Sequence, residues 1–195
     1  MIAFVRHGQT AVNRDGRLQG RVDAPLTDLG REQAASIARC FAPGSVTLVL
    51  SSPLLRARDT AVAIAAAHGV GVEVDDRLVE LDYGEWDRRS LADVSPEEWK
   101  RWRADPSFSP PGGESLVDVG ERVASFCEER LGDGLVVAVS HVSPIKAAVC
   151  WALGIDQRAT WRMHLDLASV TRIVRRGDAG VLTSYNETAH LTAAH

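Results

Sequence analysis

The sequence predicts an α/β fold, a three-layer α/β/α sandwich with a mostly parallel central sheet. Short runs rich in β-branched and apolar residues alternate with longer stretches of helical periodicity, the pattern of strands joined by crossover helices. The run over residues 135–140 contains Val-Val-Ala-Val, as expected of a strand buried inside such a sheet. Clear start signals precede several of the helical stretches and indicate where these helices begin.

The apolar runs give the expected strands. In chain order we expect them at Ile2–Arg6, Val46–Leu50, Val70–Val74, Leu135–Ser140, Ser169–Val174 and Val181–Tyr185. The run at Val70–Val74 gives the weakest of these signals. The last two runs are close together in the sequence and are expected to form a closing pair of strands.

Three helices have local start signals. Thr27 can cap a helix that runs to about Phe41, before Pro43-Gly44. The sequence Ser95-Pro96-Glu97-Glu98 combines a capping serine, a proline at the first helical position and a capping-box glutamate. Ser115 with Asp118 is a weaker capping box, which opens a helix to about Leu131.

Two further helices are expected to begin at serine-proline pairs. Ser52-Pro53 and Ser143-Pro144 each place a serine before a proline. A proline at the first helical position costs little, because its missing N–H would have no partner there. We therefore expect Ser52 and Ser143 to be N-caps.

Length and composition indicate one globular domain, residues 1–195. The chain has 45% hydrophobic and 25% charged residues, which is ordinary globular usage. The Pro- and Gly-rich segment Asp105–Gly113 is expected to be a loop too short to separate two domains. Residues 86–115 are expected to form a small helical excursion over the mouth of the site.

Charge and cysteine usage limit the partners and the compartment. The formal net charge of −4 gives no overall basic field for nucleic acid or for a membrane surface. The N-terminal run Ile2–Val5 is too short for a signal-peptide core or a membrane span. Three widely spaced cysteines in apolar stretches favour reduced thiols in a cytoplasmic protein. The oligomeric state stays open, a homodimer included.

Polar clusters follow three of the predicted strands directly. Arg6-His7-Gly8 follows the first, Ser51-Ser52-Pro53 leads to Arg56 after the second, and Ser140-His141 ends the strand over residues 135–140. Ligands of open parallel sheets bind beyond the carboxyl ends of the strands, so these clusters are expected to share one crevice.

The residue types in this crevice fit a compact dianion. Arginines offer forked donors to phosphate oxygens, and helix N-termini add backbone N–H groups and partial positive charge. Positive neighbours disfavour imidazolium, so a histidine among arginines keeps a lone pair for attack. Phosphoryl transfer otherwise needs positioning, charge stabilisation and an acid for the leaving group.

The chain resembles the histidine phosphatase superfamily, the phosphoglycerate-mutase-like fold. The likeness extends over nearly the whole chain, and six motifs of the family occur in it in the family's order. They are "RHGQTAVN" (6–13), "GRVDAPLTDLGREQA" (20–34), "SSPLLRARDTA" (51–61), "LVELDYGEW" (78–86), "PGGES" (111–115) and "VVAVSHVSPIKA" (136–147).

The resemblance implies a role for each matching residue. His7 would be the nucleophile that accepts the phosphoryl group. Arg6, Arg56 and His141 would surround the transferred phosphoryl oxygens. Glu80 would protonate the leaving alkoxide and then take a proton from the attacking water.

Further substrate contacts are implied at Gly8, Thr10, Asn13, Gly20 and Val142, the two glycines allowing the backbone to approach the anion closely. The sequence contains neither His-x-x-x-His nor Cys-x-x-Cys spacing, so we expect no metal and no cofactor.

Two departures from the family pattern are expected to reshape the rim of the pocket. Val142-Ser143 stands where Gly-Gly or Gly-Asn is common, and Trp86-Asp87-Arg88 where Trp-Glu-Gly is frequent. The runs "VSPIK" and "HLDLAS" resemble actinobacterial members akin to α-ribazole phosphatase.

The function expected from the resemblance is a cofactor-independent phosphatase of the histidine acid phosphatase type. It would hydrolyse a small phosphorylated metabolite, a phosphate monoester, through a covalent phosphohistidine. A phosphoglycerate-mutase-type phosphoryl transferase is the alternative, although such mutases are longer after the acid motif. A non-catalytic module that binds phosphorylated ligands is disfavoured, because all the catalytic groups are present.

Two groups of residues near the mouth stay open in role. Trp99 and Trp102, at helical spacing, favour core or lid packing over ligand stacking. A basic cluster either holds a second anionic group of the substrate or forms a solvated helix face; it comprises Arg88, Arg89, Lys100, Arg101 and Arg103.

Overall fold

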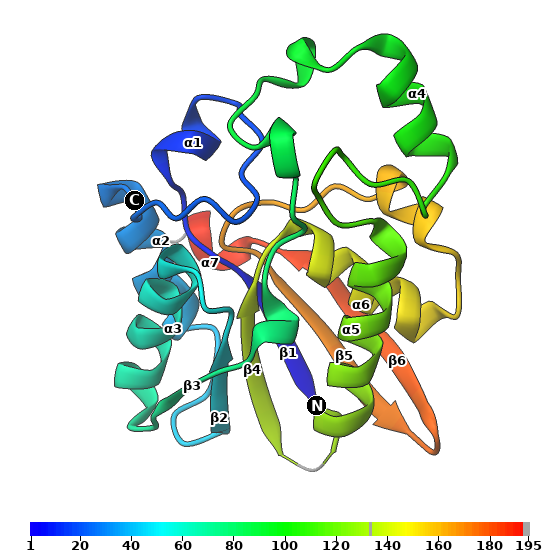
Figure 1. The fold of residues 1–195 in the computed structure, drawn as a ribbon. Helices are drawn as coiled ribbons and strands as arrows, with labels where there is room; N and C mark the ends of the chain where they lie inside the picture. Colours follow the sequence, from blue (N-terminus) through cyan, green and yellow to red (C-terminus); the bar gives the residue numbers. More distant parts are fainter. Residues whose placement is uncertain (133, 193–195) are drawn as a thin grey trace.

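The structure is a computed structural model, and it describes residues 1–132 and 134–192. A six-stranded sheet of order β3-β2-β4-β1-β5-β6 lies between two layers of helices (Figure 1). The pairs β1–β4, β2–β4 and β2–β3 are parallel, and β5 and β6 extend the sheet as antiparallel neighbours of β1. The predicted three-layer α/β/α class with a mostly parallel sheet is confirmed.

The strands match the apolar runs closely. They are β1 (Ile2–Arg6), β2 (Val46–Ser51), β3 (Val72–Val74), β4 (Leu135–Ser140), β5 (Val170–Arg176) and β6 (Ala179–Glu187). β1 and β4 agree with the prediction at both ends. The closing pair is longer than predicted, because β5 and β6 remain paired up to a tight turn at 177–178. Because this hairpin contains polar residues, the apolar runs alone predicted strands that were too short.

The helices are α1 (Ala11–Arg14), α2 (Asp28–Ala38), α3 (Leu55–His68), α4 (Pro96–Ala104), α5 (Leu116–Arg130), α6 (Val142–Leu153) and α7 (Ala189–Thr192). Short 3₁₀ helices are η1 (Asp76–Leu78), η2 (Gly84–Trp86), η3 (Leu91–Asp93) and η4 (Gln157–Arg162). The caps predicted at Thr27, Ser95 and Ser115 are confirmed, the last two as full capping boxes. The first of these helices ends at Ala38, short of the predicted Phe41.

The helix N-caps predicted at Ser52 and Ser143 were wrong. The N-cap of α3 is Leu54, and the N–H of Leu55 donates to the Asp23 carboxylate at 2.8 Å. The N-cap of α6 is His141, so Ser143 is already inside the helix. In each helix the first N–H group instead donates to a carboxylate that is distant in the sequence, Asp23 for α3 and Glu80 for α6.

Successive side chains of the strands pack alternately into two separate hydrophobic cores, one on each face of the sheet. On β1, Ile2 and Phe4 belong to a cluster with residues of α5 and α6, whereas Ala3 and Val5 join α2 and α3 on the opposite face. This period of two is what a strand buried on both faces requires. Figure 1 shows α2 and α3 gathered on one side of the sheet and α5 and α6 in front of it.

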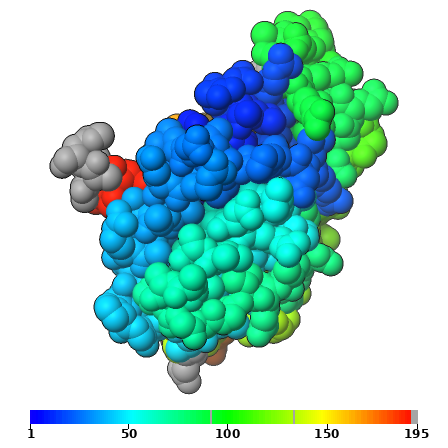
Figure 2. Space-filling view, turned by 90° about the vertical axis from the view of Figure 1, so that its left-hand side faces the viewer, coloured from blue at the N-terminus to red at the C-terminus, as the bar shows by residue number. Residues whose placement is uncertain are grey.

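A segment between η2 and α5 covers the carboxyl ends of the strands. It carries η3 and α4 and projects at the top of the molecule in Figure 1, as expected for the excursion over residues 86–115. Figure 2 shows this green segment beside the blue N-terminal segment. The two segments are joined by backbone hydrogen bonds, in which Leu18 pairs with Arg88 and Arg89 at 2.9 Å each.

Three further observations concern the cysteines, membrane-spanning helices and potential metal ligands. Cys40, Cys127 and Cys150 are free, the last two fully buried. Within the described residues, no helix has the length and apolar character needed to cross a membrane. Over the same residues, no group of three or more potential metal ligands is present.

Candidate active site

The carboxyl ends of three adjacent strands bring the two histidines together. His7 follows β1 directly, His141 follows β4, and Ser52 follows β2, the neighbour of β4 in the sheet. The ring centroids of His7 and His141 are 5.0 Å apart. Both side chains are buried, as is Arg56 from the first turn of α3.

One hydrogen bond decides which nitrogen of His7 can react. Nδ1 lies 2.7 Å from the carbonyl oxygen of Gly8. A carbonyl oxygen can only accept, so Nδ1 carries the proton and Nε2 keeps its lone pair. Arg56 Nε donates to that lone pair at 3.2 Å. His7 thus presents Nε2 toward the positive groups of the site.

The surroundings of His7 keep its ring neutral. Burial lowers the pKa of His7 well below its ordinary value, and the nearby charges of Arg56 and Arg6 lower it further. The Gly8 carbonyl opposes this shift but does not reverse it. A neutral imidazole is the form that can act as a nucleophile.

Arg56 is fixed by the loop that follows α1. Its guanidinium donates to the carbonyl oxygens of Gly20 at 2.7 Å and Val22 at 3.1 Å. Burial lowers the pKa of Arg56 to about 10, which leaves the side chain charged at neutral pH. The positive charge is therefore held in one orientation beside His7 Nε2.

Arg6 supplies a second guanidinium, on a half-buried side chain. It donates to the carbonyl oxygen of Leu165 at 2.6 Å, whereas its buried Nε has no hydrogen-bond partner within the described part of the chain. Burial also lowers the pKa of Arg6. A buried, unpaired donor on a cation is costly, so this group favours an incoming anion.

His141 is oriented by a residue that the sequence suggested as a helix cap. Its Nε2 lies 2.7 Å from Ser52 Oγ, and its buried Nδ1 has no partner among residues 1–132 and 134–192. Burial, followed by the charge of Arg56, holds the pKa of His141 well below its usual range. His141 is also the N-cap of α6, whose first N–H groups donate to Glu80.

Glu80 lies at the start of α6 although it comes from the segment after η1. Its carboxylate accepts from the N–H of Val142 at 3.1 Å, Ser143 at 3.2 Å and Leu81 at 2.8 Å. The carboxylate is buried, and these three donors with the helix N-terminus hold it in place.

The other predicted substrate contacts have structural partners of their own. Thr10 caps α1, and the Asn13 side-chain oxygen accepts from its N–H, which completes a capping box. The Gly8 N–H donates to Thr60, and a Cβ on Gly8 would meet the Gly30 carbonyl oxygen at 2.3 Å. At Gly20 the close neighbours are Tyr83 and Leu81, so both glycines are explained by packing between protein segments.

Sequence reasoning missed the role of Ser52 and the position of Lys146. Ser52 was grouped with the crevice but taken for a helix cap, although a serine directly after a strand next to a histidine-bearing strand is a signal for a partner of that histidine. Lys146 lies one helical turn after Val142, half-buried on α6. Its i+4 spacing from Val142 could have identified it as a residue on the site-facing side of the helix.

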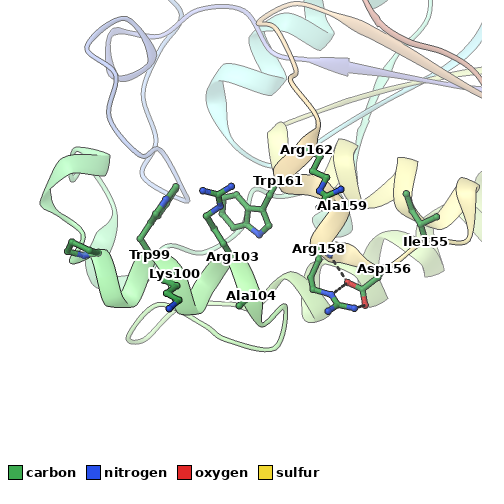
Figure 3. Close-up of a pocket in the computed structure, with 11 residues that line it drawn as sticks. Trp99, Lys100, Arg103, Ala104, Ile155, Asp156, Arg158, Ala159, Trp161 and Arg162 are labelled. Atoms are coloured by element: carbon green, nitrogen blue, oxygen red, sulfur yellow. Dashed lines mark hydrogen bonds and ion pairs between the residues drawn. The ribbon is translucent and has the colours of Figure 1, made fainter.

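The residues of the basic cluster near the mouth lie in three different places. Lys100 and Arg103 line an open groove between α4 and η4, of about 850 Å³, together with Arg158 and Arg162 (Figure 3). The guanidinium of Arg101 instead lies 4.8 Å from the ring centroid of Phe108. Arg88 and Arg89 contact the N-terminal segment through their backbones.

The chain is similar in sequence to several phosphatases. The family model described as "Histidine phosphatase superfamily (branch 1)" matches residues 2–188. A bifunctional protein of Mycobacterium tuberculosis is 41% identical over 87% of this chain and 49% of that protein. The chain thus spans about half the length of this relative. Phosphoserine phosphatase 1 of Hydrogenobacter thermophilus is 36% identical over 97% of this chain and 93% of that protein.

Solved structures of two phosphatases are similar to this chain in fold. The mycobacterial glucosyl-3-phosphoglycerate phosphatase, in complex with VO3, superimposes with a TM-score of 0.88 at 32% identity, over 96% of this chain and 98% of that one. The α-ribazole phosphatase of Shigella flexneri gives a TM-score of 0.84 at 26% identity, over 95% and 96% of the two chains.

Proposed function

This chain belongs to the histidine phosphatase superfamily (branch 1), and from that membership and the site geometry we propose that it hydrolyses phosphate monoesters of a small metabolite through a phosphohistidine. The observation that carries the proposal is the state of His7. Its Nδ1 is bound to the Gly8 carbonyl, its ring is kept neutral, and its Nε2 faces Arg56. An uncharged, oriented imidazole among guanidinium groups suits attack on a phosphate dianion.

The first half-reaction transfers the phosphoryl group to His7. The substrate phosphate displaces the contact between Arg56 Nε and His7 Nε2, and its oxygens take the donors of Arg56, Arg6 and His141. Nε2 forms the new bond to phosphorus while the bond to the ester oxygen breaks. Glu80, carrying a proton, delivers it to the leaving alkoxide.

The second half-reaction returns the enzyme to its starting state. The Glu80 carboxylate takes a proton from water as the water oxygen attacks phosphorus. The N–P bond breaks, inorganic phosphate leaves, and Nε2 regains its lone pair. Glu80 ends protonated and ready for the next leaving group, so no cofactor is consumed. This cycle explains why a single carboxylate beside one nucleophile is sufficient.

The test is to trap the intermediate. Brief incubation with ³²P-labelled substrate followed by denaturation in base should leave label on the protein, and acid should release it. His7→Ala should abolish both the label and turnover. His164→Ala is the matched control, because His164 is exposed and its Nε2 pairs with Asp166 on the surface. Label that survives acid, or turnover retained by His7→Ala, would refute the phosphohistidine route.

A further inference from the structure

A second, smaller pocket lies against the first turn of α6, where the Glu80 carboxylate is held. It has a volume of about 190 Å³, and its lining includes Val142 and Ser143. These are the residues whose N–H groups hold Glu80. Glu80 is the group proposed to protonate the leaving alkoxide, so this pocket is a space near that carboxylate into which the part of the substrate attached to the leaving oxygen can extend.

The walls of this pocket are aromatic. Tyr83, Trp99, Trp102 and Trp161 contribute to its lining. Their rings pack edge to face, with centroid distances of 4.7 Å between Trp102 and Trp161, 5.4 Å between Trp99 and Trp161, and 5.8 Å between Tyr83 and Trp102. Trp99 and Trp161 also line the neighbouring groove, which Figure 3 shows. Mutual contacts of this kind fix the pocket as a rigid, flat-sided space.

Lys146 is the charged side chain among the residues that line this pocket. No hydrogen bond or ion pair to its ammonium group is recorded within the described residues. Burial lowers the pKa of Lys146, and the charge of Arg6 lowers it further. A half-buried cation without a partner favours a ligand that brings a hydrogen-bond acceptor.

The lining disfavours small polar alcohols. The ammonium group of phosphoserine would find no carboxylate among the pocket-lining residues and would approach Lys146 instead. Ser143, Thr160 and the indole N–H groups of Trp102 and Trp161, unpartnered within the described residues, offer a few partners to the hydroxyl groups of a sugar or of glycerol. The remaining hydroxyl groups would lie against aromatic carbon, at a cost of about 1–3 kcal/mol for each that stays unpaired. A flat apolar ring avoids both penalties and gains from contact with the aromatic walls.

We propose that this pocket receives the alcohol part of the substrate, and that it selects esters in which a flat, mainly apolar ring presents a hydrogen-bond acceptor to Lys146. The proposal rests on the phosphatase function above and adds the chemical class of the substrate. The ring packs against the aromatic side chains of Tyr83, Trp99, Trp102 and Trp161. The ammonium group of Lys146 donates a hydrogen bond to the acceptor. The phosphate itself remains with His7 and its arginines.

The first test compares four esters of alcohols that are all poor leaving groups. They are pyridin-3-ylmethyl phosphate, benzyl phosphate, glycerol 3-phosphate and phosphoserine. Because the leaving oxygens are of similar kind, differences in kcat/KM report the binding of the alcohol part. We expect both ring esters to exceed the polar pair by at least tenfold, with the pyridine ester the best.

The second test uses variants of the pocket. Lys146→Met should lower kcat/KM for the pyridine ester about tenfold more than for benzyl phosphate, since only the former offers Lys146 an acceptor. Lys100→Met is the matched control, because it removes the same charge from the adjacent groove. Trp99→Leu should lower both ring esters at least fivefold more than glycerol 3-phosphate. Thermal unfolding of each variant separates these effects from loss of fold.

The outcomes distinguish the two proposals. Faster turnover of phosphoserine or glycerol 3-phosphate than of the ring esters would overturn the pocket assignment while leaving the phosphatase function intact. Equal losses for all four esters in Lys146→Met, together with weaker inhibition by inorganic phosphate, would place Lys146 in the phosphoryl site and also overturn it. Absence of hydrolysis for every ester would refute the proposed function itself.

Discussion

At the residue scale, the proposed chemistry depends on how side chains around His7 are held. The Gly8 carbonyl selects the tautomer, and Arg56 lies against the reactive nitrogen. Arg56 is in turn fixed by two backbone carbonyl groups, so its position does not depend on bound phosphate. Preorganised donors of this kind stabilise charge in the transition state without having to reorient.

The first prediction concerns Arg56. Arg56→Ala should lower kcat about 10²–10³-fold, the usual effect of losing one preorganised donor. Arg56→Lys should recover only part of this loss, because one ammonium group cannot contact His7, Gly20 and Val22 as the planar fork does. Arg58→Ala, an exposed change on the same helix, is the control. Wild-type kcat/KM in the lysine variant would remove Arg56 from the phosphoryl site.

The second prediction follows from the lowered pKa values of the buried His7 and His141. Below about pH 6.5 the unfolded chain takes up protons at these histidines, whereas the folded chain does not. Stability is therefore fully present above that pH and is lost as the pH falls toward the folded-state pKa values. Each histidine contributes up to about 1.4 kcal/mol per pH unit to this loss.

Urea unfolding between pH 7.5 and 5 measures this loss. His141→Asn should flatten the slope by close to one proton, whereas the exposed His164→Asn should not change it. Equal slopes in the wild type and His141→Asn would show that His141 is protonated in the folded protein. Such a result would also weaken the argument for a neutral His7.

At the scale of the elements, local signals predicted what local interactions determine. Both ends of β1 and β4 follow from their apolar runs, and the Ser95 and Ser115 helices begin where their own side chains cap them. The starts of α3 and α6 could not be found in this way. Their N–H groups are received by Asp23 and Glu80, carboxylates 32 and 62 residues away.

The third prediction concerns the contact between α2 and the loop that carries His7. A Cβ on Gly30 would meet the Gln9 carbonyl oxygen at 2.2 Å, and backbone cannot move aside as a side chain can. Gly30→Ala should therefore destabilise the fold by about 1–3 kcal/mol, as other overpacked sites do. It should also lower kcat, because the displaced loop follows His7 directly.

Gly71→Ala is the matched control for this prediction, since a Cβ there meets nothing within 4 Å. It should be neutral, or stabilising by about 0.4–1 kcal/mol through the unfolded state. Urea unfolding and steady-state kinetics on both variants decide the matter. A Gly30→Ala protein with wild-type stability would mean that α2 can shift away from the loop without cost.

At the scale of the whole molecule, topology assembles a site that no single segment contains. The rule that ligands bind beyond parallel strand ends was enough to group His7, Arg56 and His141 from the sequence. Glu80 does not follow a strand, and it was identified from the family resemblance alone. The aromatic pocket could not be foreseen, because Trp99 and Trp161 come from segments 62 residues apart that meet only in the folded chain.

The last prediction separates a phosphatase from a mutase, and it depends on what covers the phosphohistidine. A mutase must keep water from its intermediate until the phosphoryl group is returned to substrate. Here the cover consists of the short segment with η3 and α4, and Glu80, the proposed base for water, is held by the first N–H groups of α6. We therefore expect steady release of inorganic phosphate from p-nitrophenyl phosphate, unchanged by EDTA and independent of 2,3-bisphosphoglycerate.

Glu80→Gln adds a second measurement on the same cycle. It should slow an alkyl ester far more than p-nitrophenyl phosphate, because p-nitrophenolate leaves without needing a proton. The deciding assay supplies 3-phosphoglycerate with and without the bisphosphate and measures both 2-phosphoglycerate and free phosphate. Rapid isomerisation that requires the bisphosphate, with negligible phosphate release, would make the chain a mutase. In that case the α4 segment would have to exclude water despite its small size, by closing over Glu80 once the phosphoryl group is on His7.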